Sequence, residues 1–212
     1  SKERCTRSSY QEVGGRLMTR SVLSTLAIAD SAISTAKVAN NAITTAKLPA
    51  DFSNGITFYE TMRMTASLAG SGGDINEAFE STDTGNPAKK LIGGSGMSAS
   101  SGIFTFPATG MYLLLTGVRY YAGADISYNA HTIKTSNDNF SSNDIEAAQT
   151  FSSWGNRTGT SYEAMHCNYV FDCENTSTHK FKMRYASTGT ITVAGNTDAN
   201  ETYVTVIRLG DT

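Results

Sequence analysis

The sequence predicts an all-β sandwich preceded by a short repetitive segment. Residues 102–123 read as a strand, a turn and a longer strand, and further stretches of alternating apolar and polar residues follow up to residue 210. Between residues 13 and 48 the apolar positions recur every five residues. Neither an α-helix nor a strand can place such a period on one face, so a separate repetitive segment is predicted there. The 212 residues suffice for one such domain and an extension.

The central stretch is Gly102 to Gly123, in which Pro107 and Gly110 separate two apolar runs. Side chains alternate along a strand, so Tyr112, Leu114, Thr116, Val118 and Tyr120 share one face of the second run. The other face carries Leu113, Leu115, Gly117, Arg119 and Tyr121. Because both faces are apolar, we expect a second sheet to cover one of them and a partner subunit or a neighbouring loop to cover the other.

Seven residues of this stretch have a characteristic spacing: Gly102, Phe104, Phe106, Pro107, Gly110, Tyr112 and Leu114. The spacing resembles the C1q/TNF-like signature G-x-F-x-x-P-x-x-G-x-Y-x-F, although Leu114 replaces a frequent aromatic and Pro107 directly follows Phe106. The ending, residues 203–210, is similar to the closing strand of phage-type versions of this domain. The resemblance implies a jelly-roll head over residues 56–212.

Composition limits the kinds of partner and cofactor. The formal charge of -2 and a charged fraction of 17% argue neither for nucleic acid nor for membrane attachment. The three cysteines, Cys5, Cys167 and Cys173, are an odd number, and the last two would lie about 20 Å apart along one strand. We expect free, buried thiols. There is no run of eighteen apolar residues and no apolar core of a signal peptide, so we expect a soluble protein without signal-peptide export.

Residues 1–20 have an excess of basic side chains: Lys2, Arg4, Arg7, Arg16 and Arg20. One interpretation is a solvated tail. The other is a docking arm that becomes ordered on a larger assembly, such as a virus particle.

Residues 21–55 contain a ten-residue repeat followed by a hinge. Residues 26–35 and 36–45 share four identities, and the copies resemble the A-I-T-T-A-K-[IVL] decads in the shafts of phage tail fibres. So short a repeat needs neighbours to bury its apolar side chains, which three chains side by side would supply. A helix over residues 20–47 is the alternative. Pro49 to Gly55 reads as the hinge.

Further strands are expected along the head. One covers residues 56–68, with Glu60 as the exception to its alternation, and a loose glycine-rich region with weak strands near 78–80 and 89–92 runs to residue 101. Others cover 127–135 and 144–151. The pair 162–173 and 179–186 is joined by a turn. It places Met165, Cys167, Tyr169, Phe171, Cys173, Phe181, Met183 and Tyr185 on apolar faces and Lys180, Lys182 and Arg184 on the opposite face.

Recognition and metal sites have only weak signals. Trp154, Asn156 and Arg157 lie in a predicted loop, which is either a sugar or protein receptor site or a plug packed on the sandwich. His166 is expected to point outward, and His131 and His179 to lie near loops. None has a carboxylate at ligand spacing, although a threefold axis would gather three copies of one histidine. No catalytic motif is present, so we expect no enzyme activity and no cofactor.

Together these observations predict a homotrimeric phage virion protein, a head or tail fibre assembled in the host cytoplasm. Its N-terminus would dock on capsid or tail proteins, and its β head would decorate the capsid or bind a host surface glycan or protein. The predicted trimer seam comprises Leu23, Ile28, Ile33, Val38, Ile43, Leu48, Tyr112, Leu114 and Tyr203. A secreted adhesin or lectin-type module is the alternative. A glycan-cleaving tailspike would require a carboxylate pair in a groove.

Overall fold

The computed structural model describes residues 12–13, 16–17, 56–82, 91–155 and 159–212. The chain divides into two units, Ser1–Phe52 and Ser53–Thr212. In the first unit two short strands, β1 (Glu12–Val13) and β2 (Arg16–Leu17), pair antiparallel. The predicted shaft and hinge, residues 21–55, lie outside the described residues.

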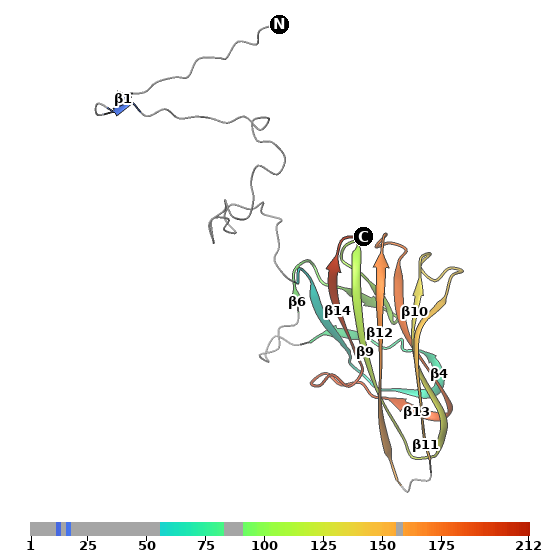
Figure 1. Ribbon diagram of the computed structural model, residues 1–212. Helices are drawn as coiled ribbons and strands as arrows, with labels where there is room; N and C mark the ends of the chain where they lie inside the picture. The colour runs from blue at the N-terminus through green and yellow to red at the C-terminus, as the bar shows by residue number, and fades with distance from the viewer. Residues whose placement is uncertain (1–11, 14–15, 18–55, 83–90, 156–158) are drawn as a thin grey trace, which may run out of the picture. The chain divides into compact units, whose positions relative to one another are not determined.

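The second unit is all-β, as the sequence predicts, because every regular element described in it is a strand (Figure 1). The strands are β3 (Tyr59–Met64), β4 (Leu68–Asp74), β5 (Phe79–Ser81), β6 (Leu91–Ile92), β7 (Ser98–Ser100), β8 (Ile103–Thr105), β9 (Gly110–Ala122), β10 (Ile126–Ser136), β11 (Ile145–Trp154), β12 (Ser161–Cys173), β13 (Lys180–Val193) and β14 (Tyr203–Gly210).

These strands form two antiparallel layers. The first, here called the β9 layer, has the order β12-β9-β14-β3, and the short strands β5 and β6 pair with β3. The second, the β13 layer, has the order β11-β10-β13, and β4 and β8 lie along the other side of β13. The end of β13 also pairs with β9, and β11 contacts β12, so the sandwich is nearly closed. This architecture agrees with the jelly-roll prediction.

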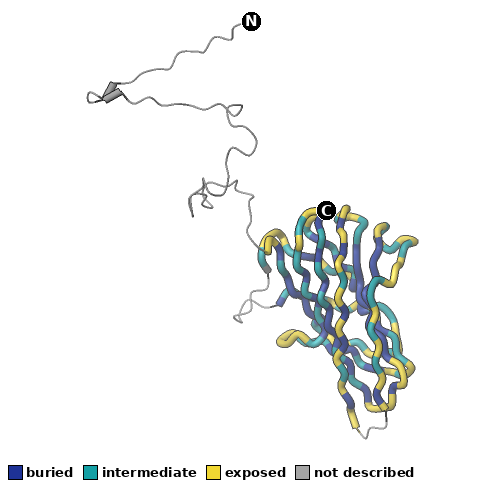
Figure 2. The backbone as a smooth tube through the Cα atoms, viewed as in Figure 1, coloured by how far each residue is buried: buried dark blue, intermediate teal, exposed yellow. Residues whose placement is uncertain are grey.

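The core lies between the layers. Along the strands, buried residues that face the other layer alternate with more exposed residues that face outward (Figure 2). The predicted inner face of β9 is buried throughout, from Tyr112 to Tyr120. Phe106 joins the layers. The centroid of its ring lies 4.5 Å from that of Tyr112 in β9, 5.0 Å from that of Phe171 in β12 and 5.5 Å from that of Phe181 in β13. Interlocked aromatic rings of this kind contribute much of the stability of a small sandwich.

Two of the predicted strand–turn–strand segments do not form hairpins, because their strands lie in different layers. Strand β8 pairs with β13 and β7, whereas β9 lies between β12 and β14. The turn between β8 and β9 therefore carries the chain from one layer to the other. The same holds for β12, which pairs with β9, and β13, which pairs with β10. A turn signal shows where the chain reverses, but a hairpin and a change of layer use the same turn residues.

The predicted strand over residues 56–68 is two strands. Strand β3 pairs with β14, and β4 pairs with β13, so the chain changes layer at residues 65–67. The glycine-rich residues 70–74, predicted to be a loop, complete β4 through backbone pairing. Glu60 faces the interior, where its carboxylate accepts hydrogen bonds from Ser81 Oγ and from the Met97 amide at 2.5 Å. These donors allow a carboxylate to occupy an inward position.

The lysines of β13 lie on the face opposite the apolar one, as predicted, and they are buried there on the outside of the β13 layer. Lys182 Nζ lies 3.1 Å from Asp74 Oδ2 and 3.0 Å from Asp144 Oδ2, and Lys134 Nζ lies 3.0 Å from Asp144 Oδ1. Lys134 and Lys182 hold the pKa of Asp144 below its usual value despite the opposing effect of burial. The free-energy cost of removing such charges from water is lower when they are paired than when a single charge is buried alone.

Replacing Phe106 with Ala should lower the free energy of unfolding by about 3–5 kcal/mol, because it leaves a cavity between both layers. Ile145→Ala, at a side chain that is 51% exposed, should cost about 1 kcal/mol or less. Urea denaturation followed by tryptophan fluorescence would measure both. Equal losses for the two variants would contradict the position of Phe106 in the core.

Candidate functional site

The outer face of the β9 layer is apolar although it faces away from the core. The register places four side chains in one row across the strands: Val170 in β12, Leu113 in β9, Ile207 in β14 and Tyr59 in β3. Val170 is 46% exposed, and the other three are half-buried. The outer face of this layer therefore carries a continuous row of three aliphatic side chains and one tyrosine.

The next two rows along the strands, both on the same side, extend this surface. One contains Leu115 with the hydroxyls of Thr61 and Thr205, whose oxygens lie 2.7 Å apart. The other contains Gly117, and a Cβ atom there would lie 2.5 Å from a ring carbon of Tyr203. Glycine thus lets the Tyr203 ring lie against β9. We call this surface the aliphatic face and define it by Tyr59, Leu113, Leu115, Val170, Tyr203 and Ile207.

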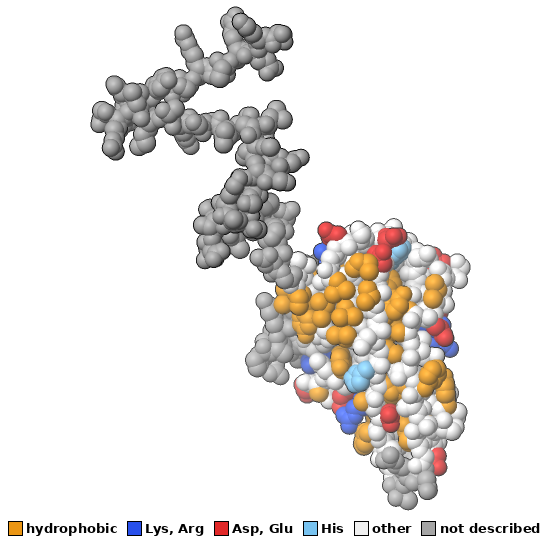
Figure 3. Space-filling model, in the orientation of Figure 1, with side chains coloured by type: hydrophobic (Ala, Val, Ile, Leu, Met, Phe, Trp, Pro, Cys, Tyr) orange, Lys and Arg blue, Asp and Glu red, His pale blue; other side chains and the backbone are white. Residues whose placement is uncertain are grey.

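Figure 3 shows hydrophobic side chains gathered on the side of the molecule where β14, β9 and β12 lie, with charged groups around them. Four charged residues of the β9 layer and its loops form two ion pairs. Arg63 Nε lies 2.9 Å from Glu80 Oε1, and Arg119 Nη1 lies 2.6 Å from Glu201 Oε1. An apolar centre with a polar rim is the composition of a protein–protein interface.

The predicted trimer seam needs correction in the head. Tyr112 and Leu114 are fully buried in the core of the single chain, so they cannot contact a second subunit. Tyr203 does point outward on β14. The predicted seam did not include the outward apolar side chains of Leu113, Leu115, Val170 and Ile207, although the alternation of β9 had already placed Leu113 and Leu115 on the outer face. The remaining seam positions lie outside the described residues: Leu23, Ile28, Ile33, Val38, Ile43 and Leu48.

Neither the docking arm nor the receptor loop forms a described site. Arg16 lies in β2, and the other docking residues lie outside the described part of the chain: Lys2, Arg4, Arg7 and Arg20. Trp154 is the last residue of β11 and is only 5% exposed, so it packs on the sandwich and is no exposed anchor. Asn156 and Arg157 lie outside the described residues.

His131 is not near a loop, contrary to the prediction. It lies within β10, fully buried, and its Nε2 is 2.7 Å from Thr116 Oγ1, which donates to the carbonyl of Cys167 at 3.0 Å. Burial lowers the pKa of His131 to about 4, an effect that the Arg184 backbone partly offsets and His166 slightly increases. No group of three potential metal ligands occurs among the described residues.

The thiols of Cys167 and Cys173 are free and buried, as predicted. Burial raises the pKa of each to about 11, which leaves them protonated and unreactive at neutral pH. Cys5 lies outside the described residues. Where the structure describes the chain, it contains no helix long and apolar enough for a bilayer.

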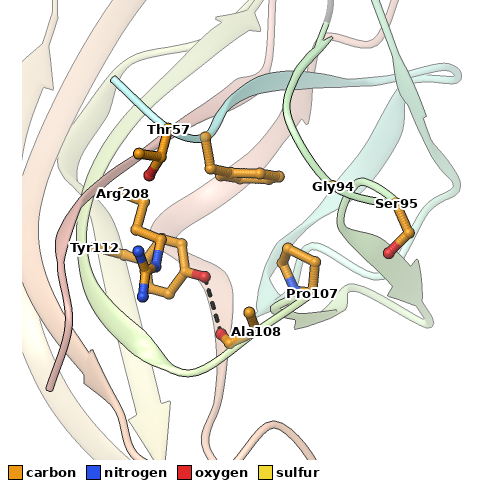
Figure 4. Close-up of a pocket in the computed structure, with 8 residues that line it drawn as sticks. Thr57, Gly94, Ser95, Pro107, Ala108, Tyr112 and Arg208 are labelled. Carbon is orange, nitrogen blue, oxygen red and sulfur yellow. Dashed lines mark hydrogen bonds between the residues drawn. The ribbon is translucent and has the colours of Figure 1, made fainter. Parts of the chain in front are cut away.

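A cavity of about 400 Å³ opens near the start of β9 (Figure 4). Two of its polar side chains are already engaged: Tyr112 Oη donates to the Ala108 carbonyl at 2.9 Å, and Arg208 donates to the Thr109 carbonyl at 3.1 Å. The other lining residues are Thr57, Phe58, Gly94, Ser95 and Pro107. The lining contains no carboxylate, histidine or thiol, so the cavity offers space without a pair of groups for proton transfer.

Gly110 shapes the wall beside this cavity. Its φ of 144° lies in the region that favours glycine, and a Cβ atom there would lie 2.6 Å from Arg208 Nε. Glycine at this position therefore lets Arg208 cross the start of β9 and reach the Thr109 carbonyl.

A scan against models of protein families finds no match, and a search of curated proteins finds no similar sequence. The aliphatic face, which is continuous over four strands, is therefore the best-supported candidate site, on structural grounds.

His131 should make the fold sensitive to acid. Its pKa is about 4 in the folded chain and about 6.5 when unfolded, so between these values only the unfolded chain takes up the proton. The stabilising contribution is complete above pH 6.5 and is lost as pH falls towards 4, at up to about 1.4 kcal/mol per pH unit. Denaturant unfolding between pH 7 and 4 would measure the slope. In His131→Gln the slope should be smaller, and an unchanged slope would contradict the assignment.

Proposed function

We propose that this protein is a non-enzymatic phage virion component, a homotrimeric head or tail fibre. Its N-terminal segment attaches to the particle, and its C1q/TNF-like jelly-roll head faces outward, where it binds the host or decorates the capsid. The observation that carries the proposal is the aliphatic face, which leaves apolar side chains uncovered on a chain whose core is already complete.

The order of the strands supports the jelly-roll assignment. From β8 to β14 consecutive strands lie in alternate layers, except that β10 and β11 are neighbours in the β13 layer. Such alternation is what two interleaved Greek keys produce, and it distinguishes a jelly roll from a meander of hairpins. The signature spacing around Pro107 coincides with one change of layer, which fits the C1q/TNF-like resemblance.

Further copies of the same chain are the partner that would cover both the decads and the aliphatic face. The decads of residues 26–45 need neighbouring chains, because one copy cannot bury their apolar positions. Closure around a threefold axis would cover the aliphatic face and the decads in the same assembly. The ion pairs Arg63–Glu80 and Arg119–Glu201 neutralise four of the charges beside the face, which reduces the repulsion that would oppose association.

The full chain should elute with three times its mass of 22.6 kDa in size-exclusion chromatography with light scattering at micromolar concentration. The double variant Leu113→Asp with Ile207→Asp should be monomeric or at least about 100-fold weaker in association, because carboxylates would be buried in an apolar contact. Both side chains point outward, so circular dichroism should report an intact fold.

The matched control is Asn175→Asp with Ser177→Asp, which adds the same two negative charges in an exposed loop and should remain trimeric. A monomeric parent chain would refute the trimer. A double variant that keeps the trimeric mass would exclude the aliphatic face as the contact.

A further inference from the structure

The outer face of the β13 layer carries an exposed aromatic pair. Tyr128 in β10 and Phe151 in β11 have ring centroids 5.7 Å apart at an interplanar angle of 43°. Tyr128 is 37% exposed and Phe151 is 59% exposed. Two touching rings thus remain open to solvent on the layer opposite to the aliphatic face.

Small and polar side chains surround these rings. The register places Phe151 beside Ala130, and Ala130 beside Ala186, so only methyl groups extend from β10 and β13 in that row. In the next row Gln149 Nε2 donates to Thr132 Oγ1 at 2.7 Å. On the other side Thr188 Oγ1 accepts from the Tyr128 amide at 3.3 Å. The two aromatic rings are therefore bordered by the side-chain amide of Gln149 and the hydroxyls of Thr132 and Thr188.

Arg184 adds a positive charge at the edge of this surface. It is the cross-strand partner of Thr132 and is exposed, and it has no ion pair with any residue that the structure describes. Its neighbour Lys182 differs, because Asp74 and Asp144 neutralise it. A free guanidinium presents a planar fork of donors that matches a carboxylate.

We propose that the surface formed by Tyr128, Phe151, Gln149 and Arg184 binds a carboxylate-bearing saccharide. The C–H face of a pyranose ring packs on Phe151 and Tyr128, its hydroxyls bond to Gln149 and Thr188, and its carboxylate pairs with Arg184. An extended acidic peptide would pair with the backbone edge of β11, which ends the layer, whereas the rings of Tyr128 and Phe151 lie on the face of the layer.

This inference rests on the proposed function in one respect: it names the class of host ligand that the head would bind. Binding would be measured by isothermal titration of the full chain with tetramers of galacturonate, glucuronate and sialate, each compared with its methyl ester. The ester keeps the ring faces and removes the charge. At least one acid should bind about tenfold more tightly than its ester.

Two variants test the residues. Phe151→Ala and Arg184→Gln should each raise Kd about tenfold, and Arg184→Lys should fall between the parent and Arg184→Gln, because lysine keeps the charge but loses the fork. Tyr162→Ala is the matched control. Tyr162 is likewise an exposed aromatic residue beside an arginine, since Arg119 Cζ lies 4.8 Å from the centroid of its ring, but it belongs to the β9 layer. Its replacement should leave Kd unchanged.

Four outcomes would overturn the proposal: no tetramer binds, acids and esters bind equally, Phe151→Ala binds as the parent does, or tetraglutamate binds as tightly as the best saccharide. Light scattering on the same samples separates this proposal from the proposed function. A monomer that binds the acidic saccharide refutes only the trimer, whereas a trimer without binding refutes only this site.

Discussion

The constraint on which the rest of the structure depends is that β9 is apolar on both faces. Its inner face meets the β13 layer, where aromatic and aliphatic side chains bury it completely. Its outer face lies in the middle of a four-stranded layer, and every neighbouring strand adds apolar side chains beside it. Since burial of apolar surface is the main favourable term in folding, the inner face organises the sandwich, whereas the outer face leaves apolar side chains partly exposed.

Polar groups inside the sandwich are placed so that their hydrogen bonds join separate strands. Thr116 in β9 bonds to His131 in β10 and to the backbone of Cys167 in β12, which links both layers through the core. Glu60 similarly joins β3 to β5 and to the backbone of Met97. A buried polar group without partners is costly, so these contacts favour one register over its alternatives.

The two layers have outer faces of different chemistry. The β9 layer presents aliphatic side chains with paired charges at its edge, and the β13 layer presents an ion-paired cluster around Asp144 and an aromatic pair beside Arg184. A subunit that associates through the first face would still leave the second open. The two proposals, association through the first face and ligand binding at the second, therefore do not compete for the same surface.

The sequence alone determined the all-β class, the faces of β9, β12 and β13, and the burial of Cys167 and Cys173, because strand periodicity depends only on which side chains alternate. The tertiary structure decided which strands pair. The turns before β9 and β13 change layer, and residues 65–67 divide one apolar run into β3 and β4. It also decided that Trp154 is buried and that Phe151 is open. Pairing and exposure depend on residues far apart in the chain, which local patterns do not encode.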